Sequence, residues 1–556
     1  MATADDEGAL ELCIVGAGPH ALALISRLLE PINDRWAESV SNGKMFQKAK
    51  KDGRVKAMVH EMGNQRPKPE IKKRMFGPYN VNNWDLARRM RIFDRHGGWL
   101  RRWDEWFGQL DIRYLRSHKM LHPDPVDRDA IQIWAEHHNR ANELFELKHL
   151  QRTRTFHGPF DVPSTPLFHD MCSHQVKRYK LESSVERAEV TLVEPMWEDG
   201  AGPEREAGGG GPPDPNAWAD GGVPGWRPPD YFKVHYSGGG EVLTRRVVLA
   251  LGSTNRPQVP EWVGAIDTEY PADRIAHVGE LVERSCAHTA DMAIDPMQSA
   301  ADGVNQTLFT PAGKGEVLVI VGGGLTSAQL VPKALELGYS HVKLLVRKPV
   351  LVKQFDIDNS WISHERNDLL AKFWSEPDFS VRRDILREAR GGGSITPEGM
   401  MGMEAPLASG LASIEEGTEV WEARWEHDPS PEGAGKMRWQ LTVSNRDDEI
   451  ACDRIWLATG SVLDVTQEPI FAEMNRLCPI SIHGGLPAVT QQLQWGKGCQ
   501  LYVMGIYAAL QLGPDALNLA GARSGSVRIT DGLQRHFNGT GAGEGTRFFD
   551  PDACNH

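Results

Sequence analysis

The sequence predicts an α/β fold made of two related Rossmann-like units, with the second unit inserted into the first. Three observations predict it. A strand, a glycine-rich turn and a helix occur twice, at residues 12–29 and 317–337. Each copy is followed by alternating strands of a small antiparallel meander. Each meander is followed by an apolar strand, and these two strands end in "LALGS" and "LATGS". We expect three layers (ββα) in each unit, and the length of 556 residues is large for a single core.

Composition limits the classes of partner. The chain has 62 Lys plus Arg against 75 Asp plus Glu, a net charge of -13, which argues against wrapping nucleic acid or coating an anionic membrane. Seven cysteines without a CxxC pair predict reduced thiols and no zinc site, so we expect no bound metal. The first residues lack the basic end and apolar run of a signal peptide, and no stretch of the sequence reaches the length of an apolar membrane span. We therefore expect a soluble, cytoplasmic protein that acts on small molecules and does not bind nucleic acid or membrane.

The first glycine turn follows the apolar strand Leu12–Val15. Gly16 allows the turn, and Gly18 leaves room for a pyrophosphate against the backbone at a helix N-terminus. The candidate contacts of this turn are Gly16, Gly18, Pro19 and His20. A tight turn without a ligand would also explain one such pattern.

The acidic residue that holds a ribose is missing at the usual distance of about 20 residues. A polar segment, residues 36–88, follows the helix and is interpreted as an insertion. After it, "RIFDRHGGW" supplies a short strand that ends in Asp94, with Trp99 close behind. We assign Asp94 to the ribose, and a surface Asp in a turn is the alternative.

The second copy makes a chance origin much less probable. Its candidate contacts are Gly322, Gly324, Leu325, Thr326 and Ser327. The strand that follows ends in Arg347 and Lys348, and positive charge at this place suits the 2′-phosphate of NADP better than the ribose diol of NAD. Two solvated bases at a strand end are the alternative.

The closing strands indicate where the chain crosses between the units. Gly252 and Gly460 end them, at places where the backbone must bend near a cofactor. The predicted domains are residues 9–253 (with the insertion 36–88 and a flexible loop at 198–230), residues 254–450, and residues 451–556 as the second part of the first domain.

Taken in order, "GAGPHA", "LALGSTNRPQVP", "RIAHVGEL", "GGGLTSA", "LATGS" and "GPDALNLAGARSG" resemble the flavoproteins with two dinucleotide-binding domains. Within that group they are similar to the flavin-containing and the lysine/ornithine N-hydroxylating monooxygenases. The resemblance implies that the first turn binds FAD and the second NADPH. It also implies that reduced flavin forms a C4a-hydroperoxide with oxygen, which oxygenates an amine or a thioether.

The resemblance adds further site residues. His277 occupies the place of a histidine after the first crossing strand and is the candidate catalytic residue. Arg116 and Ser117 are expected to border the flavin, and Gly513, Pro514 and Asp515 to lie beside its ring at a helix start. Two departures weaken the case for oxygenation: Ser461 follows the second crossing where an aromatic residue is frequent, and the histidine-containing motif of the flavin-containing monooxygenases is incomplete.

Two other functions remain open from the sequence. A flavin oxidase or reductase would use NAD(P)H without oxygenating a substrate, and a regulatory protein would keep the fold as a scaffold. No P-loop, Ser-His-Asp order or CxxC is found, which disfavours kinases, hydrolases and disulfide reductases. Substrate identity and oligomeric state are not encoded in any motif.

Overall fold

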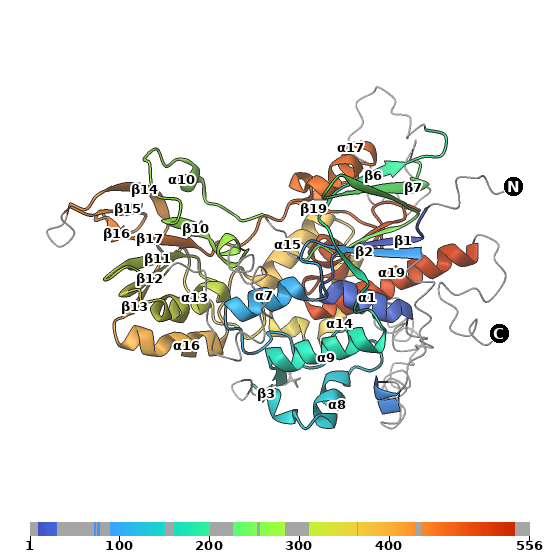
Figure 1. The fold of residues 1–556 in the computed structure, drawn as a ribbon, viewed down its shortest axis with the longest axis horizontal. Helices are drawn as coiled ribbons and strands as arrows, with labels where there is room; N and C mark the ends of the chain where they lie inside the picture. The colour runs from blue at the N-terminus through green and yellow to red at the C-terminus, as the bar shows by residue number, and fades with distance from the viewer. Residues whose placement is uncertain are drawn as a thin grey trace.

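The computed structural model describes residues 9–29, 72–73, 75–77, 89–147, 150, 161–200, 226–252, 256–283, 311–363, 365–429 and 435–539. These form two lobes that lie side by side (Figure 1). Most of the predicted insertion 36–88, with its basic stretches, and most of the loop 198–230 lie outside the described residues.

The first unit is built on a five-stranded parallel sheet of order β20-β9-β1-β2-β5. Its strands are β1 (Leu12–Val15), β2 (Met90–Asp94), β5 (Val185–Arg187), β9 (Val247–Leu249) and β20 (Leu501–Val503). Helices α1 (Pro19–Leu29) and α19 (Leu519–Gly539) pack together below it. The meander of β6 (Val190–Met196), β7 (Tyr231–Tyr236) and β8 (Gly240–Thr244) lies above it (Figure 1).

The second unit repeats this plan with a parallel sheet of order β10-β17-β11-β12-β13. Its strands are β10 (Ile275–His277), β11 (Val317–Val321), β12 (His341–Val346), β13 (Ala412–Glu416) and β17 (Arg454–Leu457). Helices α13 (Leu325–Glu336) and α16 (Pro397–Ala408) cover one face. The meander of β14 (Val420–His427), β15 (Met437–Val443) and β16 (Ile450–Cys452) covers the other.

Alternation along the central strands explains the three layers. In β11, Leu318 and Ile320 belong to the core shared with α13, whereas Val319 belongs to the core shared with the meander residues Trp439 and Leu441. Successive side chains of a strand point to opposite faces, so a strand buried on both faces is apolar throughout. The predicted fold class is confirmed, including the insertion, since β20 returns to the first sheet after the second unit is complete.

Two features differ from the predicted domain bounds. The strands β16 and β17 belong to the second unit, so the boundary follows Leu457 rather than residue 450. The pattern before "LATGS" marks a strand correctly, but strand partners are long-range choices that a local pattern does not reveal.

The second difference concerns α14 (Arg366–Ser375) and α15 (Phe379–Arg390), which follow β12 in the chain. Leu370, Phe373 and Leu386 of these helices are buried in the core of the first unit, not of the second. A segment predicted as part of the second domain therefore packs against the first, and this joins the two lobes.

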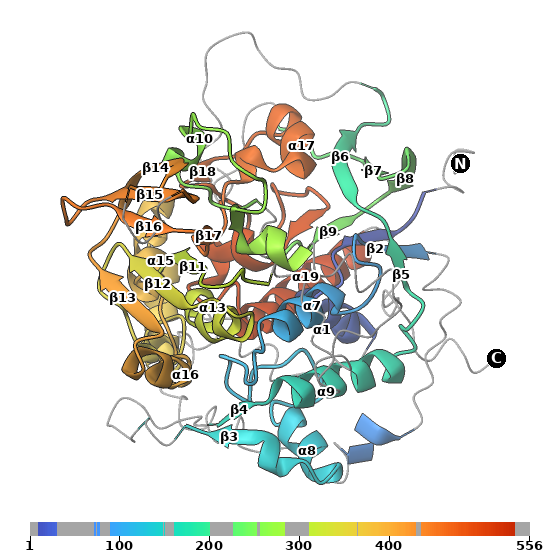
Figure 2. The same ribbon diagram turned by 60° about the vertical axis from the view of Figure 1, so that its left-hand side comes forward.

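The remaining elements lie mostly around the first unit (Figure 2). They are α7 (Arg101–Gln109), α8 (Ala130–His137), β3 (Leu144–Glu146), β4 (Asp161–Pro163), α9 (Thr165–Arg178), α10 (Glu261–Gly264), α17 (Ala472–Leu477), β18 (Ile482–His483), β19 (Leu486–Pro487), α18 (Ala509–Leu512) and short 3-10 turns at 141–143, 359–361, 465–467, 469–471 and 505–508. Within the described residues, no helix combines the length and the apolar character needed to cross a bilayer.

Candidate nucleotide-binding sites

The two glycine turns share one backbone geometry. Gly16 and Gly322 have φ of +102° and +141°, which side-chain-bearing residues rarely adopt. A Cβ on Gly16 would lie 2.4 Å from the carbonyl oxygen of Ala250, and one on Gly322 would lie 2.4 Å from that of Ala458. Glycine is therefore required at both turns by the neighbouring strand, and this holds without any ligand.

The second glycine of each turn, Gly18 or Gly324, differs from the first, because no neighbouring atom of the protein would exclude a side chain there. A Cβ on Gly18 or on Gly324 would meet nothing within 4 Å. Both residues stand directly before a helix, α1 with Pro19 at its first position and α13 with Leu325 and Thr326 in its first turn. Open space at a helix N-terminus, with amide groups and the positive end of the helix dipole, suits a phosphate.

Asp94 lies against the first turn. Its carboxylate accepts hydrogen bonds from the amides of Ala17 (3.0 Å) and His96 (2.8 Å). A carboxylate has roughly four acceptor positions, so it can also accept ribose hydroxyls. The assignment of Asp94 to the end of the second strand is confirmed; its contact with a ribose stays a prediction.

His20 links the first turn to the C-terminal segment. Its Nε2 donates to the carbonyl of Leu517 (3.1 Å), which fixes the tautomer, and burial lowers the pKa of the ring to about 4. The ring is therefore neutral at pH 7, and its Nδ1 is a buried acceptor without a hydrogen-bond partner. A donor group of a bound ligand would satisfy it.

His277 ends β10 beside β17 and is 4% exposed. The amide of Gly279 donates to its Nδ1 (3.1 Å), so in the neutral ring Nε2 carries the proton. Burial lowers its pKa, an effect partly offset by the backbone of Gly460. Its Nε2 has no hydrogen-bond partner of normal geometry. His20 therefore leaves a buried acceptor at the carboxyl edge of the first sheet, and His277 leaves a buried donor at the carboxyl edge of the second.

The residues predicted for the second nucleotide site lie at the start of α13 and just after β12. Ser327 is fully buried against Gly322, whereas Arg347 and Lys348 are exposed just after β12. The crossing glycines Gly252 and Gly460 have φ of +73° and +86°, and a Cβ there would meet nothing within 4 Å. The predicted backbone bends at the ends of β9 and β17 are confirmed.

Several residues that are predicted to contact a cofactor make hydrogen bonds within the protein. Arg116 donates to the carbonyls of Lys353 (2.7 Å), Gln354 (2.9 Å) and Phe355 (3.1 Å) and to the hydroxyl of Ser394 (2.7 Å). Its guanidinium therefore ties the first unit to the second, while Ser117 next to it is half-buried. That these two residues border a flavin stays a prediction.

The C-terminal segment shows the same pattern. Asp515 forms an ion pair with Arg366 of α14 (2.7 Å), and the carbonyl of Pro514 accepts from Arg390 of α15 (3.5 Å). A Cβ on Gly513 would lie 2.9 Å from Leu370. The helix starts at Leu519 rather than at residue 514, so the predicted helix-start contacts of Gly513, Pro514 and Asp515 move to the turn that precedes α19.

Trp99 is also engaged, since its indole N–H donates to the carbonyl of Leu181 (2.9 Å). The acidic residues after β12 make contacts within the protein: Asp356 accepts a hydrogen bond from Asn518 (2.9 Å), and Asp358 pairs with Lys353 (2.7 Å). Gln354 lines a cavity of about 280 Å³, and its Oε1 is buried without a partner.

Both turns face the seam between the units. The amide of Leu100 donates to the carbonyl of Ala17 (2.8 Å), and α7 runs from there to Leu110, which is buried in the core of the second unit. Figures 1 and 2 both place α7 between α1 and α13. From the other side, a Cβ on Gly393 would lie 3.4 Å from Gly324, and the next residue is the Ser394 bound by Arg116.

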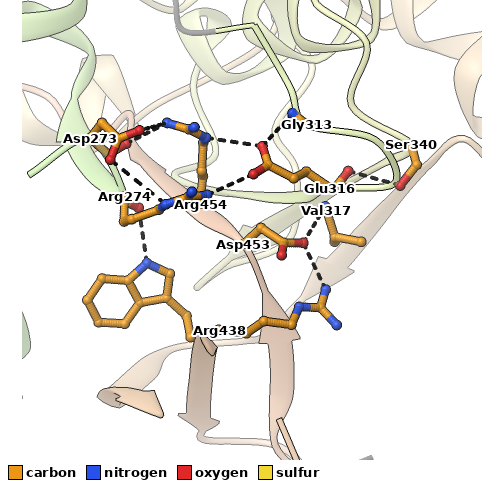
Figure 3. A network of polar contacts seen from close by, with 10 residues as sticks. Asp273, Arg274, Gly313, Glu316, Val317, Ser340, Arg438, Asp453 and Arg454 are labelled. Atoms are coloured by element: carbon orange, nitrogen blue, oxygen red, sulfur yellow. Dashed lines mark hydrogen bonds and ion pairs between the residues drawn. The ribbon is translucent and has the colours of Figure 1, made fainter. Parts of the chain in front are cut away.

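The sequence analysis missed two ion pairs, one in each unit, that lie at the amino ends of the parallel strands. Arg246 binds Glu11 (2.7 Å) below β9 and β1, and Arg454 binds Glu316 (3.3 Å) below β17 and β11. Figure 3 shows Arg454 between Asp273 and Glu316, with Arg274 also on Glu316 (2.8 Å). The signal that could have found them is a Glu directly before each glycine strand and an Arg at the start of each closing strand.

These networks are structural. They lie at the amino ends of parallel strands, away from the carboxyl ends where ligands bind in such sheets. Figure 3 adds the pairing of Asp453 with the Val317 amide (2.8 Å) and with Arg438 (3.0 Å). Burial raises the pKa of Glu316, but Arg274, the Gly313 amide and Arg454 outweigh it and hold that pKa below its ordinary value.

The cysteines of the described residues are buried free thiols: Cys13, Cys172, Cys452, Cys478 and Cys499. Burial raises the pKa of Cys13 and of Cys499 to about 12. Such thiols are poor nucleophiles, so these five are unsuited to disulfide exchange.

Comparison with solved structures agrees with this architecture. The fold is similar to that of the ornithine hydroxylase from Pseudomonas aeruginosa, with a TM-score of 0.55 and 14% identity over 95% of this chain and 100% of that chain. An ornithine N-hydroxylase from Kutzneria sp. 744 gives the same values. The L-lysine 6-monooxygenase from Pseudomonas syringae has a TM-score of 0.53 and 13% identity over 95% of this chain and 99% of that chain.

No protein-family model and no curated protein sequence matches the chain. Two parallel sheets, each with a glycine turn after one strand, form the fold that this chain shares with these solved structures. At 13–14% identity, what this chain shares with the amine hydroxylases is the fold.

Proposed function

We propose that this chain is an FAD- and NADPH-dependent monooxygenase that oxygenates a soft nucleophile, by hydroxylation of an amine nitrogen or by oxidation of a sulfur. The observation that carries the proposal is the pair of glycine turns with open second glycines on one seam. Two nucleotides held there would lie close enough for one to reduce the other. The solved structures of similar fold are named as ornithine and lysine hydroxylases, which supports an amine as the first substrate to test.

The residues of the first turn fit FAD. Gly18 leaves space for a pyrophosphate, and Asp94 offers carboxylate oxygens to a ribose. The buried Nδ1 of His20 needs a hydrogen-bond donor, which a ribityl hydroxyl or the N–H of the flavin ring would supply. The residues of the second turn fit NADPH, with Gly324 open to the pyrophosphate and Arg347 and Lys348 near the 2′-phosphate position. When bound, FAD supplies hydride acceptance and oxygen activation, chemistry that side chains lack.

The contributions of the chain itself are positioning and exclusion of water. His277 is neutral and buried, so its Nε2–H can orient an acceptor atom without adding a charge. Arg116 fixes the loop at 353–355 and Ser394 against the first unit, and thereby fixes the second turn. No general acid or base is required of the side chains, and the seam has to keep water from the reactive site. We further propose that the protein is cytoplasmic.

The test is spectroscopic and uses the purified chain. A visible flavin spectrum, bleaching by NADPH without oxygen, and conversion of an amine or thioether with matched NADPH consumption would support the proposal. Hydrogen peroxide as the sole product across a broad panel of amines and thioethers would favour an oxidase. A colourless chain that cannot be reconstituted with FAD would favour a regulatory scaffold.

A further inference from the structure

The nucleotide edge of the second unit carries charges of both signs. Arg347 follows β12 directly, and the loop between β13 and β14 lies beside it, because the amide of Thr418 donates to the carbonyl of Val346 (3.0 Å). This places Glu419 next to Arg347, with 3.4 Å between Oε1 and Nη1. The side chains are 48% and 70% exposed, so both can reach a ligand.

The backbone holds Glu419 at this position. Its amide donates to the hydroxyl of Ser444 (3.0 Å), and the Ser444 amide donates to its carbonyl (2.9 Å). The neighbouring Glu416 is occupied differently, since its carboxylate accepts from the amide of Val350 (2.7 Å). Glu419 is thus the carboxylate that faces Arg347.

Two opposite rules of recognition meet at this edge. Positive charge at this strand end accommodates the 2′-phosphate of NADP, whereas a carboxylate accepts hydrogen bonds from the 2′-hydroxyl of NAD. A phosphate monoester carries a charge of about -1.5 to -2 at pH 7. The 2′-phosphate must therefore break the ion pair between Arg347 and Glu419 in order to bind Arg347, and it then lies near the negatively charged carboxylate of Glu419.

We propose that Glu419 is a specificity-determining residue: it competes with the 2′-phosphate for Arg347 and so reduces the preference for NADPH over NADH. This inference rests on the proposed NADPH site and adds a residue that opposes it. Because the ion pair is exposed and screened by salt, its effect on affinity is moderate, about two- to fivefold at low ionic strength.

The test measures binding of nucleotide fragments to the full chain, without turnover. Isothermal titration of wild type and Glu419→Gln with 2′-AMP and with 5′-AMP separates the phosphate from the rest of the cofactor. We expect Glu419→Gln to bind 2′-AMP about fivefold more tightly at low salt, with a smaller gain at high salt and no gain for 5′-AMP. Glu449→Gln is the matched control, because Glu449 pairs with Arg424 on the meander, and it should change neither affinity.

Unchanged or weaker binding of 2′-AMP by Glu419→Gln would overturn the inference while leaving the NADPH site in place. If wild type binds neither fragment, the inference and the proposed site fail together. A gain for both fragments alike would also contradict it, because the competition concerns the 2′-phosphate alone.

Discussion

The two units share a backbone plan and differ in the charge at one strand end. In each unit a glycine turn lies against the carbonyl of the closing strand, Ala250 in the first and Ala458 in the second. The strand after the turn ends in Asp94 in the first unit, whereas in the second unit it ends at Val346 and is followed directly by Arg347. The common backbone fixes where a pyrophosphate can lie, and the strand-end charge decides which nucleotide is accepted there.

The largest expected effect separates the two turns. Gly18→Val should leave the fold intact, because its Cβ meets only open space, and abolish FAD binding, with a loss of about a thousandfold, or ~4 kcal/mol. Gly324→Val should keep the flavin spectrum and abolish reduction by NADPH to the same extent. Flavin fluorescence and anaerobic bleaching measure the two losses. A chain in which Gly324→Val loses flavin and Gly18→Val retains it would reverse the assignment.

The next effect concerns the matched ion pairs below the sheets. Arg454→Ala removes one of the two arginines that bind Glu316, and Arg246→Ala removes the nearest of the arginines around Glu11, so each loss of a charged hydrogen bond costs roughly 2 kcal/mol. Denaturant unfolding should show the loss in the second unit for Arg454→Ala and in the first unit for Arg246→Ala. Arg476→Ala, which removes an exposed pair with Glu473, should leave the stability almost unchanged and serves as control. Equal stability of all three variants would contradict a structural role for the buried pairs.

The glycine turns, strand ends and meanders were predictable because each is encoded by neighbouring residues. Gly16, Asp94 and Arg347 stand where period and turn chemistry put them. The packing of α14 and α15 against the first unit was not predictable, since Leu370 and Phe373 look like any amphipathic helix residues. The partners of Arg116 lie more than 200 residues away, so only the tertiary structure shows that it binds backbone carbonyls.

Arg116 tests whether the two units must be held in register. Arg116→Ala removes the hydrogen bonds to residues 353–355 and Ser394, and we expect flavin reduction by NADPH to slow by about tenfold through misplacement of the nicotinamide site. FAD content should not change, because the first turn is untouched. Stopped-flow reduction checks the rate, and Arg116→Lys should recover part of it. Loss of FAD with a normal reduction rate in the remaining holoenzyme would place Arg116 at the flavin after all.

Exchange of the strand-end charge tests the comparison itself. Arg347→Glu should raise the KM for NADPH about fivefold and lower that for NADH, because a carboxylate then faces the ribose. Initial rates with both cofactors measure the ratio. An unchanged ratio would mean that other residues select the nucleotide.

The smallest effect is a pH dependence of the second unit. The pKa of Glu316 is below its ordinary value in the folded chain, so its contribution to stability is present above the unfolded-state pKa of about 4.3 and is lost as pH falls through the folded pKa. Acid should therefore loosen the second unit. Circular dichroism recorded across the acid range measures the change. Glu316→Gln should be less stable at pH 7 and show a flatter pH profile; a profile identical to wild type would contradict the role of this carboxylate.

The central claim is that two nucleotides bind on one seam, close enough for hydride to pass between them. Anaerobic mixing of the FAD-loaded chain with NADPH deuterated at the transferred position tests it most directly. The account predicts bleaching of the flavin band with a primary isotope effect on the fast phase. Persistent flavin colour under saturating NADPH, in a chain that binds both nucleotides, would contradict it.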